Sequence, residues 1–328
     1  MVSGILDTRR ARAGLCPFRA ICYRPFMDIG RVGIWAFLDQ QPAARAQAAA
    51  VEIEALGYGA LWIPEALGRE AFTHAALLLG GTRRIPVATG IANIWARDAM
   101  AMAAAQKTLA EAYPERFLLG MGVSHAPMVE GMRGHRYVRP LSAMRAYLDA
   151  MDRAPFLAAQ PATKPLRVIG ALAPGMLALA AERADGAHPY FVPPAHTLLA
   201  RKLIGPRALL APEQAVVLET DPSRARPIAR AHMAIYLTLP NYVNNLRRLG
   251  FGDADVANGG SDRLVDAIVA WGDADSIVKR VRAHHDAGAN HVCLQVLGPD
   301  PLALPLADWR TLAAAFGLTS RSPAPGRS

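Results

Sequence analysis

The proton-transfer residues of this sequence stand out because they directly follow short apolar stretches. His125 comes after the run Gly-Met-Gly-Val-Ser at 120–124, and Glu65 comes after the apolar run 60–64. An imidazole titrates near pH 6.5, so His125 could donate or accept a proton at neutral pH. We therefore predict His125 as a catalytic residue. An equally open alternative is that His125 caps its loop or lines a substrate pocket.

Large aromatic side chains follow other apolar runs. Trp35, Trp95 and Tyr190 could wall an apolar pocket for a flat ring, and His188 could face the same pocket. We predict all four as substrate contacts. For each aromatic residue the alternative is an ordinary place in the core, and for His188 it is a structural place at the end of a strand.

The remaining histidines and the cysteines indicate no further site. His284 and His285 lie in a helical pattern, and we expect them to be solvated. The three cysteines, Cys16, Cys22 and Cys293, have neither metal-ligand spacing nor the number needed for a disulfide framework. Cys293 lies in an apolar run and is expected in the core. No metal site is predicted, and the free cysteines favour a reducing cytosol.

The elements that position these residues repeat one unit, a helix ended by glycine and then an apolar strand. Three helices are expected at 42–56, 174–184 and 274–286, ended by Gly57, by Gly186 and by Gly288. Continuous apolar strands are typical of a parallel sheet that is covered on both faces. The expected strands are 31–37, 60–64, 86–92, 117–121, 166–170, 187–191, 215–219 and 291–297.

Eight strands that alternate with helices predict an α/β fold, a (β/α)₈ TIM barrel whose active site lies at the carboxyl ends of the strands. About seventy residues separate strands seven and eight, so we expect an insertion there with two extra helices. Such an insertion is often a lid or a contact between subunits, which leaves a homodimer open. The predicted organisation is a disordered extension at 1–26, the barrel at 27–318 and a disordered tail at 319–328.

Composition and charge argue against two classes of partner. The formal net charge is +9, but the first 26 residues and the tail carry most of it, and no basic patch with interleaved aromatics occurs. Nucleic acid is therefore not an expected partner. Mean hydropathy is +0.15, yet no run of 18 apolar residues occurs, so no membrane span is expected. We expect a cytoplasmic enzyme that acts on a small molecule.

The run Thr-Gly-Ile-Ala-Asn-Ile-Trp-Ala-Arg at 89–97, together with the other strand ends, resembles the luciferase-like monooxygenase superfamily. Within it, the chain is most similar to predicted coenzyme F420-dependent oxidoreductases, over residues 27 to about 318. The resemblance implies a cis peptide bond at Gly90–Ile91 and a catalytic acid at Glu65. In the sugar-phosphate-oxidising relatives a histidine follows that acid, whereas Ala66 follows it here, so the same substrate is not expected.

The resemblance also implies a cradle for the cofactor, F420 or alternatively FMN. Glycine lets backbone amides approach a ring or phosphate closely, and a helix that begins near Gly175 offers free N–H groups to an anion. The implied cofactor-binding residues are Gly90, Ile91, Asn93, Gly120, Gly122, Ser124, Ala171, Ala173, Gly175 and Met176.

The leading hypothesis is an oxidoreductase that moves hydride between F420 and an organic substrate. One rival is an FMN-dependent monooxygenase that uses molecular oxygen on the same fold. Another is a barrel that carries a ligand without turnover. A Rossmann dehydrogenase fits poorly, because no Gly-x-Gly-x-x-Gly follows the first strand.

Overall fold

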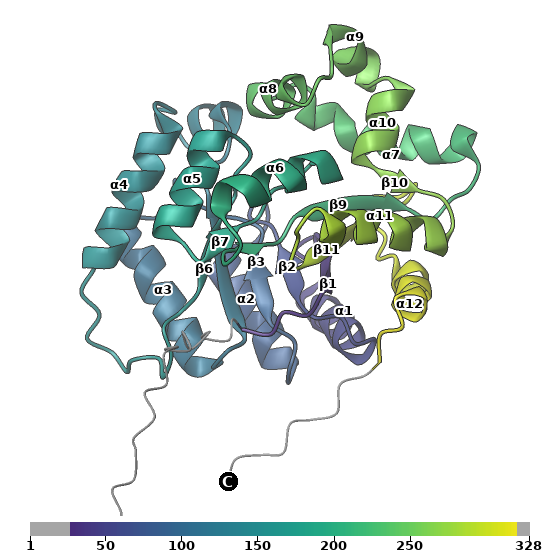
Figure 1. Cartoon of the computed structure of the whole chain (residues 1–328). Coiled ribbons are helices and arrows are strands. Elements are labelled where there is room, and N and C mark those ends of the chain that lie inside the picture. Colours follow the sequence, from purple (N-terminus) through teal and green to yellow (C-terminus); the bar gives the residue numbers. More distant parts are fainter. Residues whose placement is uncertain (1–26, 320–328) are drawn as a thin grey trace, which may run out of the picture.

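The fold is an α/β arrangement in which helices surround a curled parallel sheet (Figure 1). A computed structural model describes residues 27–319, so the predictions for 1–26 and for the tail from 320 lie outside the described residues. The strands are β1 (Val32–Trp35), β2 (Leu61–Ile63), β3 (Val87–Thr89), β4 (Ala92–Asn93), β5 (Phe117–Gly122), β6 (Arg167–Ile169), β7 (Gly186–Ala187), β8 (Leu209–Leu210), β9 (Glu213–Val217), β10 (Ala270–Trp271) and β11 (Val292–Val296).

From β1 to β7 a helix follows each strand or pair of short strands, as the sequence pattern predicts, whereas four helices in succession follow β9 instead of the two extra ones expected. They are α1 (Ala43–Ala55), α2 (Ala71–Gly81), α3 (Ala99–Ala112), α4 (Pro140–Arg153), α5 (Pro174–Arg183), α6 (Pro194–Ile204), α7 (Pro222–Tyr236), α8 (Pro240–Arg248), α9 (Asp253–Val256), α10 (Asp262–Ile268), α11 (Ala274–Asp286) and α12 (Leu306–Ala315), with short π- and 3₁₀-helical segments at Pro127–Met132 and Ala257–Gly259. Gly57 and Gly288 adopt positive φ angles of 87° and 101° where α1 and α11 end, as predicted. Gly186 does not end α5. It lies in β7, where a Cβ atom would overlap the carbonyl of Leu209.

All strand pairs are parallel, in the order β10-β9-β11-β1-β2-β3-β5-β6-β7-β8, with β4 beside β5. One stretch of chain, 209–217, takes part in both sides of this path. Its strand β8 is the last of the order and pairs with β7, and its strand β9, next to β10 at the other end, pairs with β11. The two residues between them continue the bridge, since Ala211 N donates to Ala187 O at 3.0 Å and Cys293 N donates to Pro212 O at 3.1 Å. The sheet therefore curls until its two sides meet on the same stretch.

Some strands differ from the predicted bounds for local reasons. The strand expected at 187–191 stops at Ala187, because Pro189 has no N–H for a ladder and Phe191 has a φ of 60°. The strand expected at 215–219 begins earlier and ends at Val217. The predicted third strand is divided into β3 and β4. The two-residue strands β8 and β10 were not predicted, since so few residues carry no readable period.

The core has an inner layer, which the curled sheet encloses, and an outer layer under the helices. Trp35, Trp62, Leu118, Val168 and Cys293 belong to the inner layer. Cys293 is fully buried, as predicted.

The prediction for His284 is wrong, and His285 is also partly buried. His284 donates through Nε2 to Gln214 Oε1 at 2.9 Å, and its Nδ1 accepts from the Thr197 hydroxyl at 2.8 Å. This bridge ties α11 to α6 and β9.

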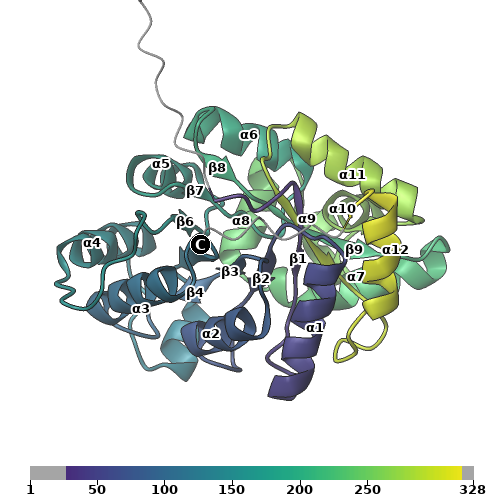
Figure 2. The same ribbon diagram turned by 90° about the horizontal axis from the view of Figure 1, so that it is seen from below.

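Helices α7 to α10 form a group beyond the carboxyl ends of the strands (Figure 1). Seen from below, α8 lies behind the middle of the sheet, so the two views agree that it covers this end (Figure 2). A separate apolar cluster that includes Met233, Leu246, Leu264 and Val265 holds the group together. Between residues 27 and 319, no helix is long and apolar enough to cross a membrane.

Candidate active site at the carboxyl ends of the strands

The break between β3 and β4 lies at the centre of the predicted site. The Gly90–Ile91 bond is cis, which confirms the prediction for this bond. The indole of Trp35 donates to Gly90 O at 3.0 Å, and the Thr89 hydroxyl donates to Gly120 O at 2.7 Å. Gly120 N in turn donates to Thr89 Oγ1 at 2.9 Å. These bonds fix the segment 89–93, which we call the bulge, to β1 and β5.

The glycines of β5 are required by the bulge itself. A Cβ atom on Gly120 would overlap Thr89 O, and one on Gly122 would lie 2.7 Å from Ile91 Cδ1. A Cβ atom on Gly170, after β6, would lie 3.3 Å from Ile91 Cγ2. Protein atoms, rather than space for a ligand, therefore lie against Gly120 and Gly122. Gly120 therefore faces the Thr89 backbone, and Gly122 faces the Ile91 side chain.

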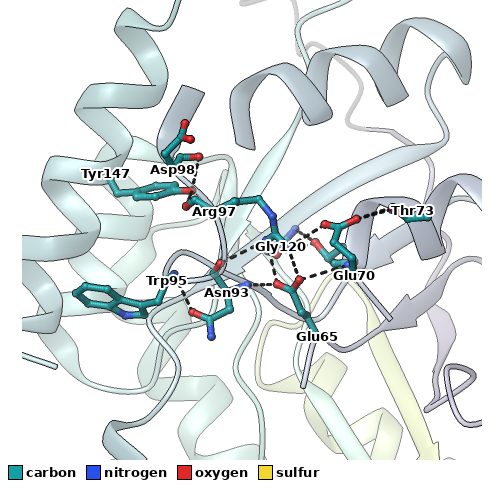
Figure 3. Close-up of polar contacts among 11 residues, drawn as sticks. Glu65, Glu70, Thr73, Asn93, Trp95, Arg97, Asp98, Gly120 and Tyr147 are labelled. Carbon is teal, nitrogen blue, oxygen red and sulfur yellow. Dashed lines mark hydrogen bonds and ion pairs between the residues drawn. The ribbon is translucent and has the colours of Figure 1, made fainter. Parts of the chain in front are cut away.

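A buried ion pair supports the bulge from outside (Figure 3). Both oxygens of Glu65 accept from the Arg97 guanidinium, and Oε2 also accepts from Asn93 N at 2.7 Å. The two side chains are only 5% and 11% exposed. Glu70 adds a second contact to Arg97 at 2.8 Å. With its oxygens occupied in this way, Glu65 has the geometry of a group that positions the bulge.

Asn93 carries an unused hydrogen-bond donor beside this pair. Its Oδ1 accepts from Trp95 N at 3.0 Å. Its Nδ2 is buried and has no hydrogen-bond partner among residues 27–319. Buried donors are normally paired, so this atom is suited to a ligand acceptor.

His125 lies beyond the carboxyl end of β5, directly after the left-handed residue Ser124, whose φ is 57°. Its Nδ1 donates to Asn241 Oδ1 at 3.2 Å, and its ring centroid lies 5.4 Å from that of Tyr242. Because Nδ1 carries the hydrogen in this arrangement, Nε2 is the free basic atom. Burial lowers the pKa of His125 below its ordinary value, and the bond to Asn241 opposes that shift. The imidazole is therefore neutral at pH 7.

His188 and Trp35 lie deeper than the sequence predicts for substrate contacts. Both are almost completely buried, and a Cβ atom on Gly90 would lie within 3 Å of each side chain. His188 donates through Nδ1 to Ala211 O at 2.7 Å and stacks on Trp62 at 4.3 Å between centroids. Burial lowers its pKa to about 4. In this structure the two residues support the bulge from below.

The other two predicted substrate contacts are only partly buried. Trp95 donates to Val123 O at 3.0 Å. The Tyr190 hydroxyl donates to Gln295 Oε1 at 2.7 Å and lies 2.8 Å from the Tyr236 hydroxyl. The Tyr190 ring, which follows β7, thus meets the Tyr236 ring of α7 at 5.3 Å between centroids.

The predicted phosphate cradle occupies the start of α5. Ala171 is buried, Ala173 and Met176 are partly exposed, and Gly175 is exposed. No side chain caps this helix, Pro174 has no N–H, and Met176 N and Leu177 N both donate to Ala173 O at 3.0 Å. The N–H that its first turn offers to solvent or an anion is therefore that of Gly175. His196 holds the preceding loop by donating to Leu172 O at 2.9 Å.

Four residues of this region were not predicted from the sequence. Arg97 was visible in the 89–97 motif, but its pairing with Glu65 depends on how the strands are placed. Asn241 and Tyr242 reach the site from a segment more than a hundred residues beyond His125. Glu213 carried a readable signal, a lone carboxylate in the apolar run 208–218. No group of three His, Cys, Asp or Glu side chains in the described part could hold a metal.

The sequence profile of the family described as luciferase-like monooxygenase matches residues 30–291. A curated Mycobacterium tuberculosis protein named "Putative coenzyme F420-dependent oxidoreductase" is 32% identical over 199 residues. That match covers 51% of this chain and 56% of the relative, so the chain spans little more than half the length of the relative.

Several solved structures share the fold at low sequence identity. An F420-dependent secondary alcohol dehydrogenase, in complex with an F420–acetone adduct, has a TM-score of 0.72 at 15% identity, covering 89% of this chain and 99% of that one. The F420-dependent tetrahydromethanopterin reductase of Methanopyrus kandleri has 0.66 at 17%, covering 87% and 98%. The FMN-bound oxygenating constituent of a Pseudomonas putida diketocamphane monooxygenase has 0.67 at 14%, covering 88% and 97%.

Proposed function

The chain belongs to the luciferase-like monooxygenase family, and we propose that it is an oxidoreductase that transfers hydride between coenzyme F420 and a small organic substrate. The observation that carries this proposal is the 32% identity to a relative whose name specifies F420. The arrangement of the bulge, Asn93 and His125 at one end of the sheet supports it. Bound F420 would supply the hydride-accepting and hydride-donating carbon of its ring.

The residues of the site fit such a cofactor at two places. The bulge presents Ile91, half-buried between Gly122 and Gly170, and Asn93 Nδ2 offers a buried donor without a protein partner. We propose that these groups contact the ring. The uncapped start of α5, with Gly175 exposed, would receive the phosphate.

His125 is the proposed proton-transfer group. Its neutral imidazole can accept a proton at Nε2 from an alcohol as hydride leaves the neighbouring carbon, and the imidazolium returns that proton in the reverse reaction. Asn241 fixes the ring by accepting from Nδ1. Glu65, which the sequence suggested as a catalytic residue, is proposed instead to position the bulge through Arg97 and Asn93 N.

We also propose a finer description of the fold. With 209–217 counted as one strand and β3 and β4 as another, the curled sheet is an eight-stranded barrel to which β10 is added. The elements from α7 to β10 would then be the insertion before the last strand. The contact of Asn241 with His125 favours a cover for the site over a contact between subunits.

The second candidate is an FMN-dependent monooxygenase. The similarity to the FMN-bound monooxygenase favours it, since its TM-score of 0.67 lies close to those of the F420 enzymes.

A turnover assay distinguishes the F420-dependent oxidoreductase from the FMN-dependent monooxygenase. The purified protein is mixed with F420 and a secondary alcohol, with cyclohexanol as the first probe, and the F420 absorbance is followed under nitrogen. We expect F420 to be reduced. Turnover only with reduced FMN and oxygen would favour the monooxygenase, and no turnover with either cofactor would favour a ligand carrier.

A further inference from the structure

Glu213 is a buried carboxyl group that the proposed mechanism does not use. It begins β9, is 1% exposed and lies opposite Cys293 in the sheet register. Its Oε2 accepts from Phe191 N at 3.1 Å. Its Oε1 is buried and has no hydrogen-bond partner among the described residues. A buried carboxyl with one donor for two oxygens is unusual and requires a reason.

Within residues 27–319, no positively charged group faces Glu213. The titratable groups that face it are the phenols of Tyr190, Tyr236 and Tyr242 and the thiol of Cys293. Burial holds all four groups in their neutral forms at pH 7. His232, which packs near this cluster on the Phe191 ring, is also neutral because burial lowers its pKa to about 4. Burial without a counter-ion raises the pKa of Glu213 to about 8.

The group that Glu213 holds is a strained point of the backbone. Phe191 has a φ of 60°, which a bulky residue rarely adopts without support from its surroundings. The Phe191 ring packs on Tyr236 at 4.9 Å and on Tyr242 at 5.4 Å between centroids. Tyr190, one residue earlier, packs on Trp35 at 5.3 Å. The turn at 190–191 therefore joins the inner layer beneath the bulge to the helices that cover the site.

We propose that Glu213 is a positioning residue that works as a neutral carboxylic acid and sets the turn at Tyr190 and Phe191, one wall of the substrate site. The assignment of this wall to a substrate rests on the proposed function, whereas the role of Glu213 in the turn does not. When Glu213 ionises, the carboxylate needs further donors, and the hydroxyls that face it include those that hold Tyr190 and Tyr236 together. Ionisation therefore rearranges the wall.

The protonation state is tested without any ligand. Infrared spectra of the whole protein are recorded between pH 6 and 9.5 for the native chain, Glu213→Gln and Glu219→Gln. Glu219 is a matched control, because it follows the same strand but its carboxylate accepts from Asp221 N and Arg224 near the surface. We expect a protonated-carboxyl band at pH 6.5 that is lost near pH 8, that is absent in Glu213→Gln and that is unchanged in Glu219→Gln. Absence of this band from the native protein at pH 6.5 would overturn the proposal.

The positioning role is tested by near-ultraviolet circular dichroism over the same pH range. The aromatic signal of the native chain should change near pH 8, whereas Glu213→Gln, whose amide oxygen can still accept from Phe191 N, should stay constant. Glu213→Leu, which removes the acceptor, should differ from the native spectrum at every pH. A native signal that is flat to pH 9.5, or a Glu213→Gln signal that still titrates, would contradict the role.

Kinetics with cyclohexanol and F420 then connect this role to the site. Glu213→Leu should raise KM roughly tenfold with kcat preserved, as expected when a buried acceptor of the substrate wall is lost, and Glu213→Gln should restore KM. A fall in kcat at unchanged KM would contradict the positioning role. If the native enzyme fails to turn over, the proposed function is at fault, while the infrared and dichroism results still decide the role of Glu213.

Discussion

At the scale of single residues, His125 is the group on which the proposed chemistry depends. Its Nδ1 is occupied by Asn241 and its pKa is lowered by burial, so Nε2 is a neutral base at pH 7. His125→Asn should lower kcat by roughly a hundredfold or more, the usual contribution of a general acid–base group. The F420 dissociation constant should stay within a few-fold of native. His135→Asn, an exposed histidine of the following loop, serves as the control.

A different pattern would assign His125 to the loop alone. In that case cofactor affinity and melting temperature would fall together in His125→Asn, and turnover of the bound complex would survive. Steady-state kinetics, F420 titration and thermal unfolding of the same preparations distinguish these outcomes.

At the scale of elements, the Glu65–Arg97 pair should stabilise the fold by holding β2 to the bulge. Removing one partner leaves the other charge buried, which typically costs about 3–5 kcal/mol. Glu65→Gln should therefore lower the free energy of unfolding by about 3 kcal/mol in urea titrations. Glu70→Gln should cost below about 1 kcal/mol, since Glu70 is 45% exposed. Equal effects of the two substitutions would refute the positioning role of Glu65.

The fit between β5 and the bulge gives a second prediction at this scale. Gly122→Ala places a methyl group 2.7 Å from Ile91 Cδ1, so the Ile91 side chain must move. Overpacking of this kind costs about 1–3 kcal/mol, and we expect F420 affinity to fall at least tenfold. Gly131→Ala is the control, because nothing lies within 4 Å of its added methyl group. Native affinity in Gly122→Ala would place the ring away from Ile91.

Helices and strands were predictable from the sequence where a hydrophobic repeat extends over a long segment. Contacts between helices and strands were not predictable. Helix α11 has the predicted bounds, because a capped amphipathic segment specifies itself locally. His284 was misjudged, because Thr197 and Gln214, its partners, lie on other elements. Gly122 was recognised as necessary, but the sequence could not show that Ile91, rather than a ligand, fills the space beside it. The pairing of Glu65 with Arg97 was likewise not predictable, because it depends on how two separate segments are placed in the fold.

At the scale of the whole molecule, buried neutral histidines should make the fold sensitive to acid. Burial lowers the pKa to about 3 or 4 in five of them: His74, His188, His232, His284 and His291. Their pKa in the unfolded chain is near 6.5. As pH falls below 6.5 the unfolded chain gains protons that the native fold cannot, so stability is lost down to about pH 4.

With five such groups, the free energy of unfolding changes by up to about 7 kcal/mol per pH unit. Glu213 acts in the opposite sense at higher pH, since its raised pKa costs stability between about pH 4.5 and 8. Urea unfolding at pH 7, 6 and 5 should show a steep loss of stability toward acid. Equal unfolding midpoints at the three pH values would show that the histidines are not held neutral.

The most direct test of the central claim is an equilibrium titration of the native protein with F420 and with FMN, side by side, followed by quenching of tryptophan fluorescence. Trp35 and Trp95 lie beside the bulge, so a ring bound there should quench them. We predict saturable binding of F420, with FMN at least tenfold weaker, and a loss of F420 quenching in Gly122→Ala but not in Gly131→Ala. Tighter binding of FMN, or binding of F420 that is indifferent to Gly122→Ala, would contradict the account.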